Sequence, residues 1–438
     1  MKTVAVISPD FTPSSMPNAL RVRLLVEHLQ EYGWEPVVIA TDPQYYEQPA
    51  DPENESLLRG KYEIIRTCAW PARFTRRFGL GDVGLRSFYY QWRALSQLCR
   101  SRKVDLVFIS VPPNYSMALG RLANLRFAVP YVIDYQDPYI TDYYKTVPPA
   151  QRPPKWRLAY ALAHLVEPFS VRRAAHLVSV DTSYLTGVIQ RYKWFAAGDA
   201  TGVQLGVEPA DFDYIRQSPR ENPIFDKSDG LLHVSYVGRG GPDMLAAAGA
   251  LFEAVILGGR ESPELFDRIR LHFVGTDYAY AGAARHQLLP LARQMGVEQQ
   301  VDEHPQRVPY LTALQILLDS HALVVVGSTE SHYTPSKIFP YILAKKPLLG
   351  IFNESSSVVG ILRDAGAGEV VTFSREAPPG TRVREIYDKL RAVLSSVGEP
   401  RQVCWDAFEP YTARAITARL VTAFEKALAH SSGNDSDG

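Results

Sequence analysis

Short apolar runs and longer amphipathic segments alternate from the first residues of the chain. Val4–Ile7 is a short run rich in β-branched side chains, and Val37–Ala40 is a second one. Between them, from Ala19 to Tyr32, apolar residues recur at helical spacing until Gly33, which is a typical residue at a helix end. A strand, a helix and a strand in this order predict a βαβ unit and therefore a parallel sheet.

The same alternation continues to about residue 205 and resumes at residue 231. The first series predicts strands at 62–66, 104–110, 130–134, 176–180 and 202–205, and helices at 86–101, 115–127, 155–174 and 183–192. The second predicts strands at 231–237, 271–274, 322–326, 347–351 and 369–372, and helices at 243–257, 281–295, 309–319, 335–345, 356–364, 381–396 and 408–429. Helices cover both faces of such sheets, so the pattern predicts two doubly wound, Rossmann-like α/β domains facing each other across a cleft.

Residues 206–230 interrupt the alternation with three prolines and many charges. This composition predicts an irregular linker and a hinge. Asp211-Phe212-Asp213 within it has the spacing of a DxD metal motif, but no strand supports it, so we expect a turn there.

Composition and charge narrow the functional classes. The 438 residues are enough for two or three domains of ~150 residues, and 47 basic against 47 acidic residues give no net charge. Broad nucleic-acid binding needs a positive surplus, so we expect no nucleic-acid partner. Met1–Ser8 is too short for a signal peptide, and no apolar run reaches the ~18 residues of a membrane span. We expect a cytoplasmic protein, at most peripheral at the inner membrane surface.

Metal and cofactor motifs are not evident in the sequence. The three cysteines lie far apart without a CxxC pair, and the ten histidines form no ligand-spaced pair, so we expect buried free thiols and no metal site. Gly238-Arg239-Gly240-Gly241 follows a predicted strand, but Asp243 stands where a dinucleotide-binding fingerprint needs its third glycine. We therefore expect no bound cofactor.

The segment after the strand at 322–326 indicates an anion site. A polar loop leads to Thr334, a suitable helix N-cap, and Pro335 fits the first helical position. Free N–H groups at that helix end, with Ser336 and the charge of Lys337, suit a phosphate or diphosphate. The alternative is an ordinary capped helix with an exposed lysine. Pro340 should kink this helix.

Tyr333–Leu349 resembles the C-terminal donor motif of family-4 GT-B glycosyltransferases. Other stretches of this chain are similar to motifs of that family in the right order: Ser110–Pro113, Asp134–Pro138, Gly206–Glu208, Val237–Arg239, Leu271–Gly275 and Asp364–Val371. The resemblance implies a GT-B fold with an acceptor-side domain of residues 1–215 and 415–438 and a donor-side domain of residues 225–410.

The same resemblance implies an activity and its residues. It implies sugar transfer from a nucleotide-diphosphate sugar to a glycan, lipid-linked or small-molecule acceptor, with retention of configuration and without a metal. The donor would contact Gly238, Arg239, Gly275, Thr334, Ser336 and Lys337, and Asp134 and Asp137 would orient or deprotonate the acceptor hydroxyl. Fixed cations are suited to the negative charge that develops on a leaving diphosphate. The alternative for Asp134 and Asp137 is that they lie in turns at the ends of strands, where their side chains cap the neighbouring backbone.

The sequence departs from the family pattern at several positions. The family's Glu-x7-Glu pair falls at His332 and Pro340, no lysine follows Arg239 closely, and Ser14–Pro17 replaces a Gly-Gly loop. These departures keep open a non-catalytic pseudo-glycosyltransferase that acts as a binding or partner subunit. A sugar-nucleotide epimerase on the same fold is a third reading.

Residues 61–103 are basic and aromatic. They hold ten Lys or Arg against Glu63 and Asp82, with interleaved Trp, Phe and Tyr residues. Such a surface suits an anionic membrane or a lipid-linked acceptor, and the alternative is a solvated helix face over an aromatic core.

Overall fold

The computed structural model describes residues 1–434 except 49, 79–80, 149–151, 153–154, 278–282 and 330–335. The chain divides into two compact units, unit 1 of Met1–Gly206 and Ala413–Gly438 and unit 2 of Val207–Thr412. The functional domain limits of 1–215 with 415–438 and of 225–410 stay predictions.

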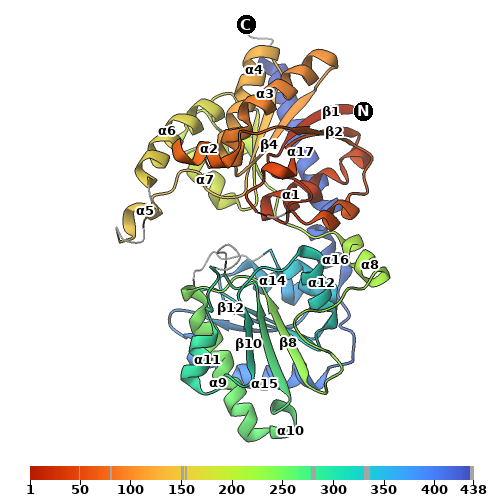
Figure 1. The fold of residues 1–438 in the computed structure, drawn as a ribbon, viewed down its shortest axis with the longest axis vertical. Helices are drawn as coiled ribbons and strands as arrows, with labels where there is room; N and C mark the ends of the chain where they lie inside the picture. Colours follow the sequence, from red (N-terminus) through yellow and green to blue (C-terminus); the bar gives the residue numbers. More distant parts are fainter. Residues whose placement is uncertain are drawn as a thin grey trace. The chain divides into compact units, whose positions relative to one another are not determined.

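Unit 1 is built on a seven-stranded parallel sheet in the order β3-β2-β1-β4-β5-β6-β7, of which Figure 1 labels β1, β2 and β4. Its strands are β1 (Lys2–Ile7), β2 (Trp34–Thr41), β3 (Glu63–Thr67), β4 (Leu106–Val111), β5 (Tyr131–Tyr135), β6 (His176–Ser179) and β7 (Ala200–Gly202). Its helices are α1 (Pro17–Val26), α2 (Ala72–Thr75), α3 (Val83–Ser101), α4 (Met117–Phe127), α5 (Tyr143–Thr146), α6 (Trp156–Val171), α7 (Thr182–Arg191) and α17 (Ala413–Asn434). Two separate apolar clusters cover the two sheet faces, as a doubly wound fold requires.

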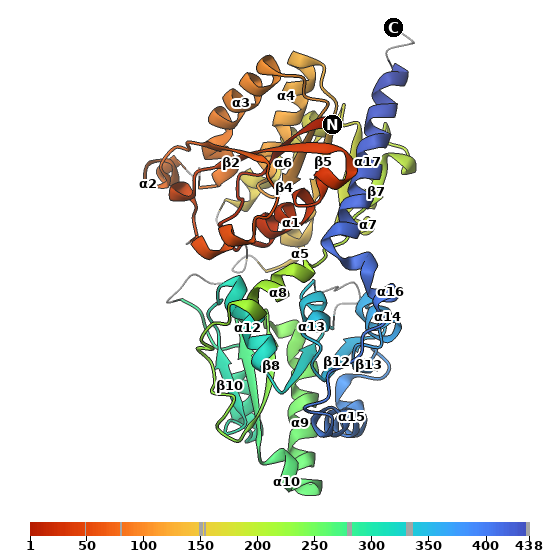
Figure 2. The same cartoon turned by 90° about the vertical axis from the view of Figure 1, so that its right-hand side faces the viewer.

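The last helix of the chain belongs to unit 1. Figure 2 shows α17 running beside the sheet of unit 1, and the Thr417 hydroxyl donates to the Leu25 carbonyl of α1 at 3.0 Å. Phe424 packs edge-on against Trp34 and Phe108 in the core. The C-terminal segment therefore completes the core of the N-terminal sheet.

Unit 2 is built on a six-stranded parallel sheet in the order β10-β9-β8-β11-β12-β13. Its strands are β8 (Leu232–Val237), β9 (Ile269–Val274), β10 (Val301–His304), β11 (Ala322–Val326), β12 (Leu348–Asn353) and β13 (Glu369–Phe373). Its helices are α8 (Pro209–Gln217), α9 (Leu245–Glu261), α10 (Pro263–Phe266), α11 (Leu289–Met295), α12 (Tyr310–Asp319), α13 (Ile338–Ala344), α14 (Ser357–Asp364), α15 (Val383–Ser395) and α16 (Trp405–Phe408).

Two predictions of secondary structure are wrong. Helix α8 occupies part of the expected linker, and Asp211 of the supposed turn lies buried in its first turn, because Pro209 and the Glu208 cap start a helix. Strand β10 was not expected, because an edge strand with the sequence Val-Asp-Glu-His carries little apolar signal.

Two expectations from composition also need correction. Cys68 and Cys404 are exposed rather than buried. The segment Pro242–Glu261 is long and apolar enough to span a membrane, with a mean hydropathy of 1.3, although half of it is buried. It packs against α15 and α11, as expected of a core helix in a globular domain.

Candidate functional site

The strand order of unit 2 reverses between β8 and β11. In open α/β sheets, ligands bind beyond the carboxyl ends of the strands at such a switch point. Gly238 and Arg239 follow β8 directly, and the loop after β11 leads to Ser336 and Lys337. The topology therefore brings these predicted donor residues to one place, although about a hundred residues separate them in sequence.

Lys337 and Arg239 are linked through Tyr236. The Lys337 Nζ donates to the Tyr236 hydroxyl at 2.6 Å and lies 4.5 Å from the centre of the Tyr236 ring. The same hydroxyl donates to the Arg239 carbonyl at 2.6 Å. Tyr236 is fully buried, so it fixes the position of the ammonium group relative to the loop after β8.

The environment of Lys337 disfavours its charge. Burial and the nearby Arg239 charge lower the pKa of Lys337 to about 7. A lysine in this state gains its full charge when an anion arrives, because an opposite charge stabilises the ammonium form. The site is therefore suited to a phosphate and sensitive to pH near neutrality.

Gly238 makes the close approach of Lys337 possible. Its φ is +156°, and a Cβ at this position would lie 2.1 Å from Lys337 Nζ. Gly275 ends the neighbouring strand β9 with a φ of +73°, and its N–H donates to the His304 carbonyl at 2.8 Å. Both glycines thus keep the backbone at this edge in conformations that other residues rarely adopt.

Asp243 engages Arg239. The guanidinium donates to both carboxylate oxygens, at 3.0 and 2.8 Å, and Arg239 and Asp243 side chains are about one-fifth exposed, at 22% and 21%. A bidentate pair holds the guanidinium plane in place. An incoming diphosphate has to share the guanidinium with this carboxylate or displace the carboxylate from it. The sequence pattern did not reveal this pairing.

The predicted capped helix is shorter than expected. Thr334 and His332 lie outside the described residues, Ser336 is exposed in a turn, and α13 begins only at Ile338 with no side-chain cap from Lys337. Pro340 is the third residue of α13, a position in the first turn at which its missing N–H costs no intrahelical hydrogen bond. The helix therefore begins later than the sequence predicted, and Pro340 lies in its first turn rather than near the end of its second.

Asp134, predicted on the acceptor side, is a core residue of unit 1. Arg21 donates to its two oxygens at 2.8 and 2.7 Å, and both side chains are fully buried. The Ser110 hydroxyl also donates to it at 2.8 Å. A carboxylate held in this way has no face left for an acceptor hydroxyl, and its geometry is that of a structural ion pair.

Two other aspartates of unit 1 have the properties of acid–base groups. Partial desolvation raises the pKa of Asp137 above its ordinary value, although this residue is exposed in the loop after β5. Burial also raises the pKa of Asp10 to about 6. Asp10 follows β1, next to the β1–β4 switch point of this sheet, and the Asn18 amide donates to it at 3.2 Å. Asp10 was not predicted from the sequence, because its loop carries no motif. Its place next to the switch point of the sheet marks it as a candidate functional residue.

The basic segment 61–103 is only partly available at the surface. Arg86 is buried and donates to backbone carbonyls such as that of Trp70, and Lys103 pairs with Asp105 at 2.7 Å. Trp70 and Phe74 are each 53% exposed, and the Arg73 guanidinium lies 4.7 Å from the Phe74 ring centre. The exposed basic-aromatic character is therefore concentrated around α2.

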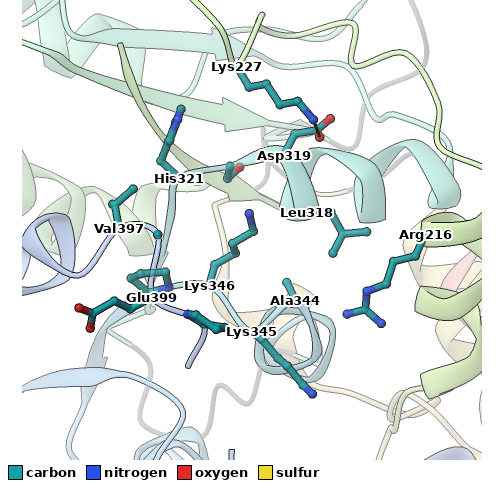
Figure 3. Close-up of a pocket in the computed structure, with 14 residues that line it drawn as sticks. Arg216, Lys227, Leu318, Asp319, His321, Ala344, Lys345, Lys346, Val397 and Glu399 are labelled. Carbon is teal, nitrogen blue, oxygen red and sulfur yellow. Dashed lines mark hydrogen bonds and ion pairs between the residues drawn. The ribbon is translucent and has the colours of Figure 1, made fainter. Parts of the chain in front are cut away.

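A cationic cavity of about 660 Å³ lies elsewhere in unit 2. Figure 3 shows Lys346 pointing into it near Asp319 and His321. Its lining includes the last residues of α12 and α13 and the residues just before β11 and β12, so it lies at the amino edge of the sheet. Cations at helix C-termini stabilise the helix dipoles, which accounts for this charge without a ligand.

The histidines are not as scattered as the sequence suggested. Nitrogens of His272 and His304 and an oxygen of Asp302 lie within 4.8 Å of one another. The sequence did not reveal this grouping, because these residues come from two strands whose pairing the sequence does not show.

Comparisons with known proteins concern the family and the fold. Residues 19–196 match the family model described as Glycosyl transferase 4-like domain. No curated protein matches the sequence. The identification of a family-4-like glycosyltransferase domain is thereby confirmed for this part of unit 1.

Solved structures confirm the GT-B fold over the whole chain. Alr3699/HepE from Anabaena, in complex with UDP and glucose, has a TM-score of 0.57 at 13% identity, covering 97% of this chain and 100% of that one. The Candida albicans trehalose-6-phosphate phosphatase N-terminal domain has a TM-score of 0.59 at 12% identity, covering 98% and 97%. The lipopolysaccharide outer core galactosyltransferase WaaB has a TM-score of 0.51 at 13% identity, covering 97% and 99%.

Proposed function

We propose that this chain, which carries a Glycosyl transferase 4-like domain on a GT-B fold, moves a sugar from a nucleotide-diphosphate sugar to an acceptor hydroxyl. Unit 2 would bind the donor, and unit 1 would bind the acceptor. The reaction breaks the bond between the anomeric carbon and a diphosphate oxygen. It joins that carbon to the acceptor oxygen, whose proton leaves to a base.

The observation that carries this proposal is the convergence of Lys337 and Arg239 at the switch point of unit 2. Negative charge grows on the diphosphate as the sugar bond breaks. Cations already held in position stabilise that charge without reorganisation. Arg239 can bind two phosphate oxygens with its planar fork, and Lys337 provides a compact point charge. This arrangement supports a metal-independent departure of the diphosphate.

We propose UDP as the nucleotide of the donor. The support is the structural neighbour from Anabaena, whose structure contains UDP-glucose. The acceptor class is a glycan, a lipid-linked saccharide or a small molecule, and retention of configuration follows only from the resemblance of the sequence motifs. For the acceptor side we propose Asp10 and Asp137 in place of Asp134, because the pKa of Asp10 is raised to about 6 and the pKa of Asp137 is raised above its ordinary value, and a raised carboxyl pKa suits proton transfer.

A second candidate function is a binding subunit without transfer activity. Two observations favour it: Asp243 already pairs with Arg239, and Pro340, without a carboxylate, stands at the family's second glutamate position. Nucleotide binding and sugar transfer therefore have to be measured separately.

The experiment measures binding of UDP, GDP, ADP, CMP and TDP to the full chain by calorimetry, and then hydrolysis of the matching nucleotide sugars. We expect UDP to bind, and Arg239→Ala and Lys337→Ala to weaken it at least tenfold each. Lys227→Ala is the matched control, because Lys227 is a 65% exposed lysine of unit 2 that pairs with Asp319.

Each outcome decides between the candidates. Binding of one nucleotide without any sugar release or transfer supports the binding subunit. Binding that is unchanged by both variants, or binding of none of the nucleotides, contradicts the donor site proposed here.

We further propose that the protein is cytoplasmic and contacts the inner membrane surface through the exposed part of 61–103. The exposed Trp70 and Phe74 beside Arg73 and Arg77 support this, since aromatic and basic side chains together favour anionic interfaces.

A further inference from the structure

An array of imidazoles and carboxylates crosses one face of the unit 2 sheet, outside the proposed donor site. His272 lies on β9, and its register partner on the edge strand β10 is Asp302. His304 follows two residues later, and therefore projects from the same face of β10. His233 on the adjacent strand β8 contacts His272 from the other side.

The spacing of three of these groups suits a metal ion. His272 Nδ1 lies 3.4 Å from Asp302 Oδ2, and His304 Nε2 lies 2.9 Å from the same oxygen. Ligands about 2.0–2.1 Å from a tetrahedral zinc ion are separated by roughly 3.3 Å. Small side-chain adjustments would therefore place all three donor atoms around one ion.

The hydrogen bonds of His233 determine which nitrogen of His272 is available. His233 Nε2 lies 3.1 Å from the Asp226 carbonyl and 3.0 Å from Asp229 Oδ1. Both oxygens only accept, so this nitrogen carries the hydrogen. The other nitrogen of His233, Nδ1, lies 2.9 Å from His272 Nε2, so this contact occupies the Nε2 side of His272 and leaves Nδ1 toward Asp302.

The ring nitrogen of His272 that faces Asp302 is Nδ1. His272 is 3% exposed, and its Nδ1 is a buried atom without a hydrogen-bond partner among the described residues. Nδ1 faces the Asp302 oxygen across 3.4 Å, a separation that a cation bound by both groups can bridge.

The remaining surroundings resemble those of a metal ligand. Phe225 stacks on the rings of both His233 and His272, with centroids at 4.3 and 4.7 Å. Metal-binding histidines usually donate their second N–H to a fixed partner, which sets the tautomer and the ring orientation. His233 provides that partner here. Asp302 and His304 side chains are 44% and 36% exposed, which leaves a path for an ion and for a water ligand.

We propose that His272 Nδ1, Asp302 and His304 bind a divalent transition-metal ion of the zinc type. A set of two imidazoles and one carboxylate binds Zn²⁺ in preference to Mg²⁺ or Ca²⁺. The ion would fasten edge strand β10 to β9. The loop after β10 contacts Gly275, where a Cβ would lie 3.7 Å from the Arg307 Cα, so the ion would also steady the β9 end of the donor site. This site is independent of the transferase activity.

The test uses the full chain without a polyhistidine tag, freed of metal by a chelator. We expect one equivalent of Co²⁺ to give the intense visible absorption bands of a four-coordinate site, and Zn²⁺ to abolish them. His304→Ala and Asp302→Asn should each weaken Co²⁺ binding at least tenfold. Both side chains are partly exposed, so these variants should fold.

His286→Ala is the matched control. His286 is another partly exposed histidine near β10, but its ring contacts Glu303, whose side chain is buried away from this site. It should keep the cobalt spectrum, and Zn²⁺ should raise the melting temperature of the wild type and of His286→Ala but not of His304→Ala. The proposal is overturned if the wild type gives no cobalt bands, or if His304→Ala and Asp302→Asn both keep them.

Discussion

The ammonium of Lys337 donates to the hydroxyl of Tyr236 at 2.6 Å and lies against its ring, 4.5 Å from the centroid. A buried tyrosine of β8 thus holds a lysine that arrives from beyond β11. The contact gives the donor site its shape, and it also keeps the lysine in an environment where its charge is only half populated near neutrality.

The first prediction concerns proton uptake. With a Lys337 pKa of about 7, most of these groups are neutral at pH 8, and a bound diphosphate favours the charged form. Binding of UDP at pH 8 should therefore take up a substantial fraction of one proton. Calorimetry in two buffers of different ionisation enthalpy measures this number. Lys337→Met should bind without uptake; equal uptake by wild type and variant would show that another group titrates.

The second prediction concerns Gly238→Ala. The added methyl would lie 2.1 Å from Lys337 Nζ, and the flexible lysine has to move away from Tyr236. We expect at least tenfold weaker UDP binding, with a loss of stability of about 1 kcal/mol from the unfavourable φ. Gly259→Ala in α9 is the control, because nothing lies within 4 Å of its Cβ and alanine favours a helix. Unchanged UDP affinity in Gly238→Ala would remove Lys337 from the donor site.

The third prediction concerns Asp10. Its pKa of about 6 means that the carboxylate is lost as the pH falls through that value. If Asp10 takes the proton from the acceptor hydroxyl, the rate of sugar transfer should fall below pH 6 and remain level above pH 7. Asp10→Asn should reduce the rate at least a hundredfold while UDP affinity stays within twofold. A variant with the wild-type pH profile would exclude Asp10 as the base.

The fourth prediction separates Asp134 from Asp137. Asp134→Asn leaves the fully buried Arg21 guanidinium without its counter-charge, and breaking such a pair costs about 3–5 kcal/mol. Denaturant unfolding should show this loss directly. Asp137→Asn should leave the free energy of unfolding within about 0.5 kcal/mol, as for surface loop positions. Equal stability of wild type and Asp134→Asn would return Asp134 to the list of acceptor-side candidates.

The fifth prediction concerns the membrane contact. Replacing Trp70 and Phe74 by serine removes two exposed aromatic side chains beside Arg73. Binding to vesicles containing phosphatidylserine should fall at least fivefold, and added salt should weaken wild-type binding further. Trp405→Ser, which removes a 47% exposed tryptophan of unit 2, should bind as the wild type does. Vesicle binding that changes neither with the substitutions nor with added salt would contradict membrane contact through this segment.

The sequence was most informative where the physics is local. Buried parallel strands such as Val4–Ile7 and Ala322–Val326 appear as continuous apolar runs, so both sheets and the GT-B fold were predictable. Strand β10 was not, because an edge strand buries only one side. The start of α13 was also misplaced, because capping residues mark a helix end only when their side chains reach the backbone.

In the candidate site, too, the sequence showed some features and not others. The identity of Arg239 and Lys337 as cations after strands was visible along the chain. Tyr236 between them, Asp243 on Arg239 and the burial of Asp134 against Arg21 were not. Hydrogen bonds between residues a hundred positions apart depend on strand order, and a strand order is decided by the packing of the whole sheet.

By itself, the sequence determined the type of each element and the chemical groups available to this protein, because periodicity and residue type are local properties. Only the tertiary structure decided which groups meet. It placed Asp134, predicted on the acceptor side, in a buried ion pair, and it gave Lys337 a pKa near neutrality. It also brought His272, Asp302 and His304 from two strands within reach of one ion. Burial and distance set these properties, and both arise only when the sheets assemble.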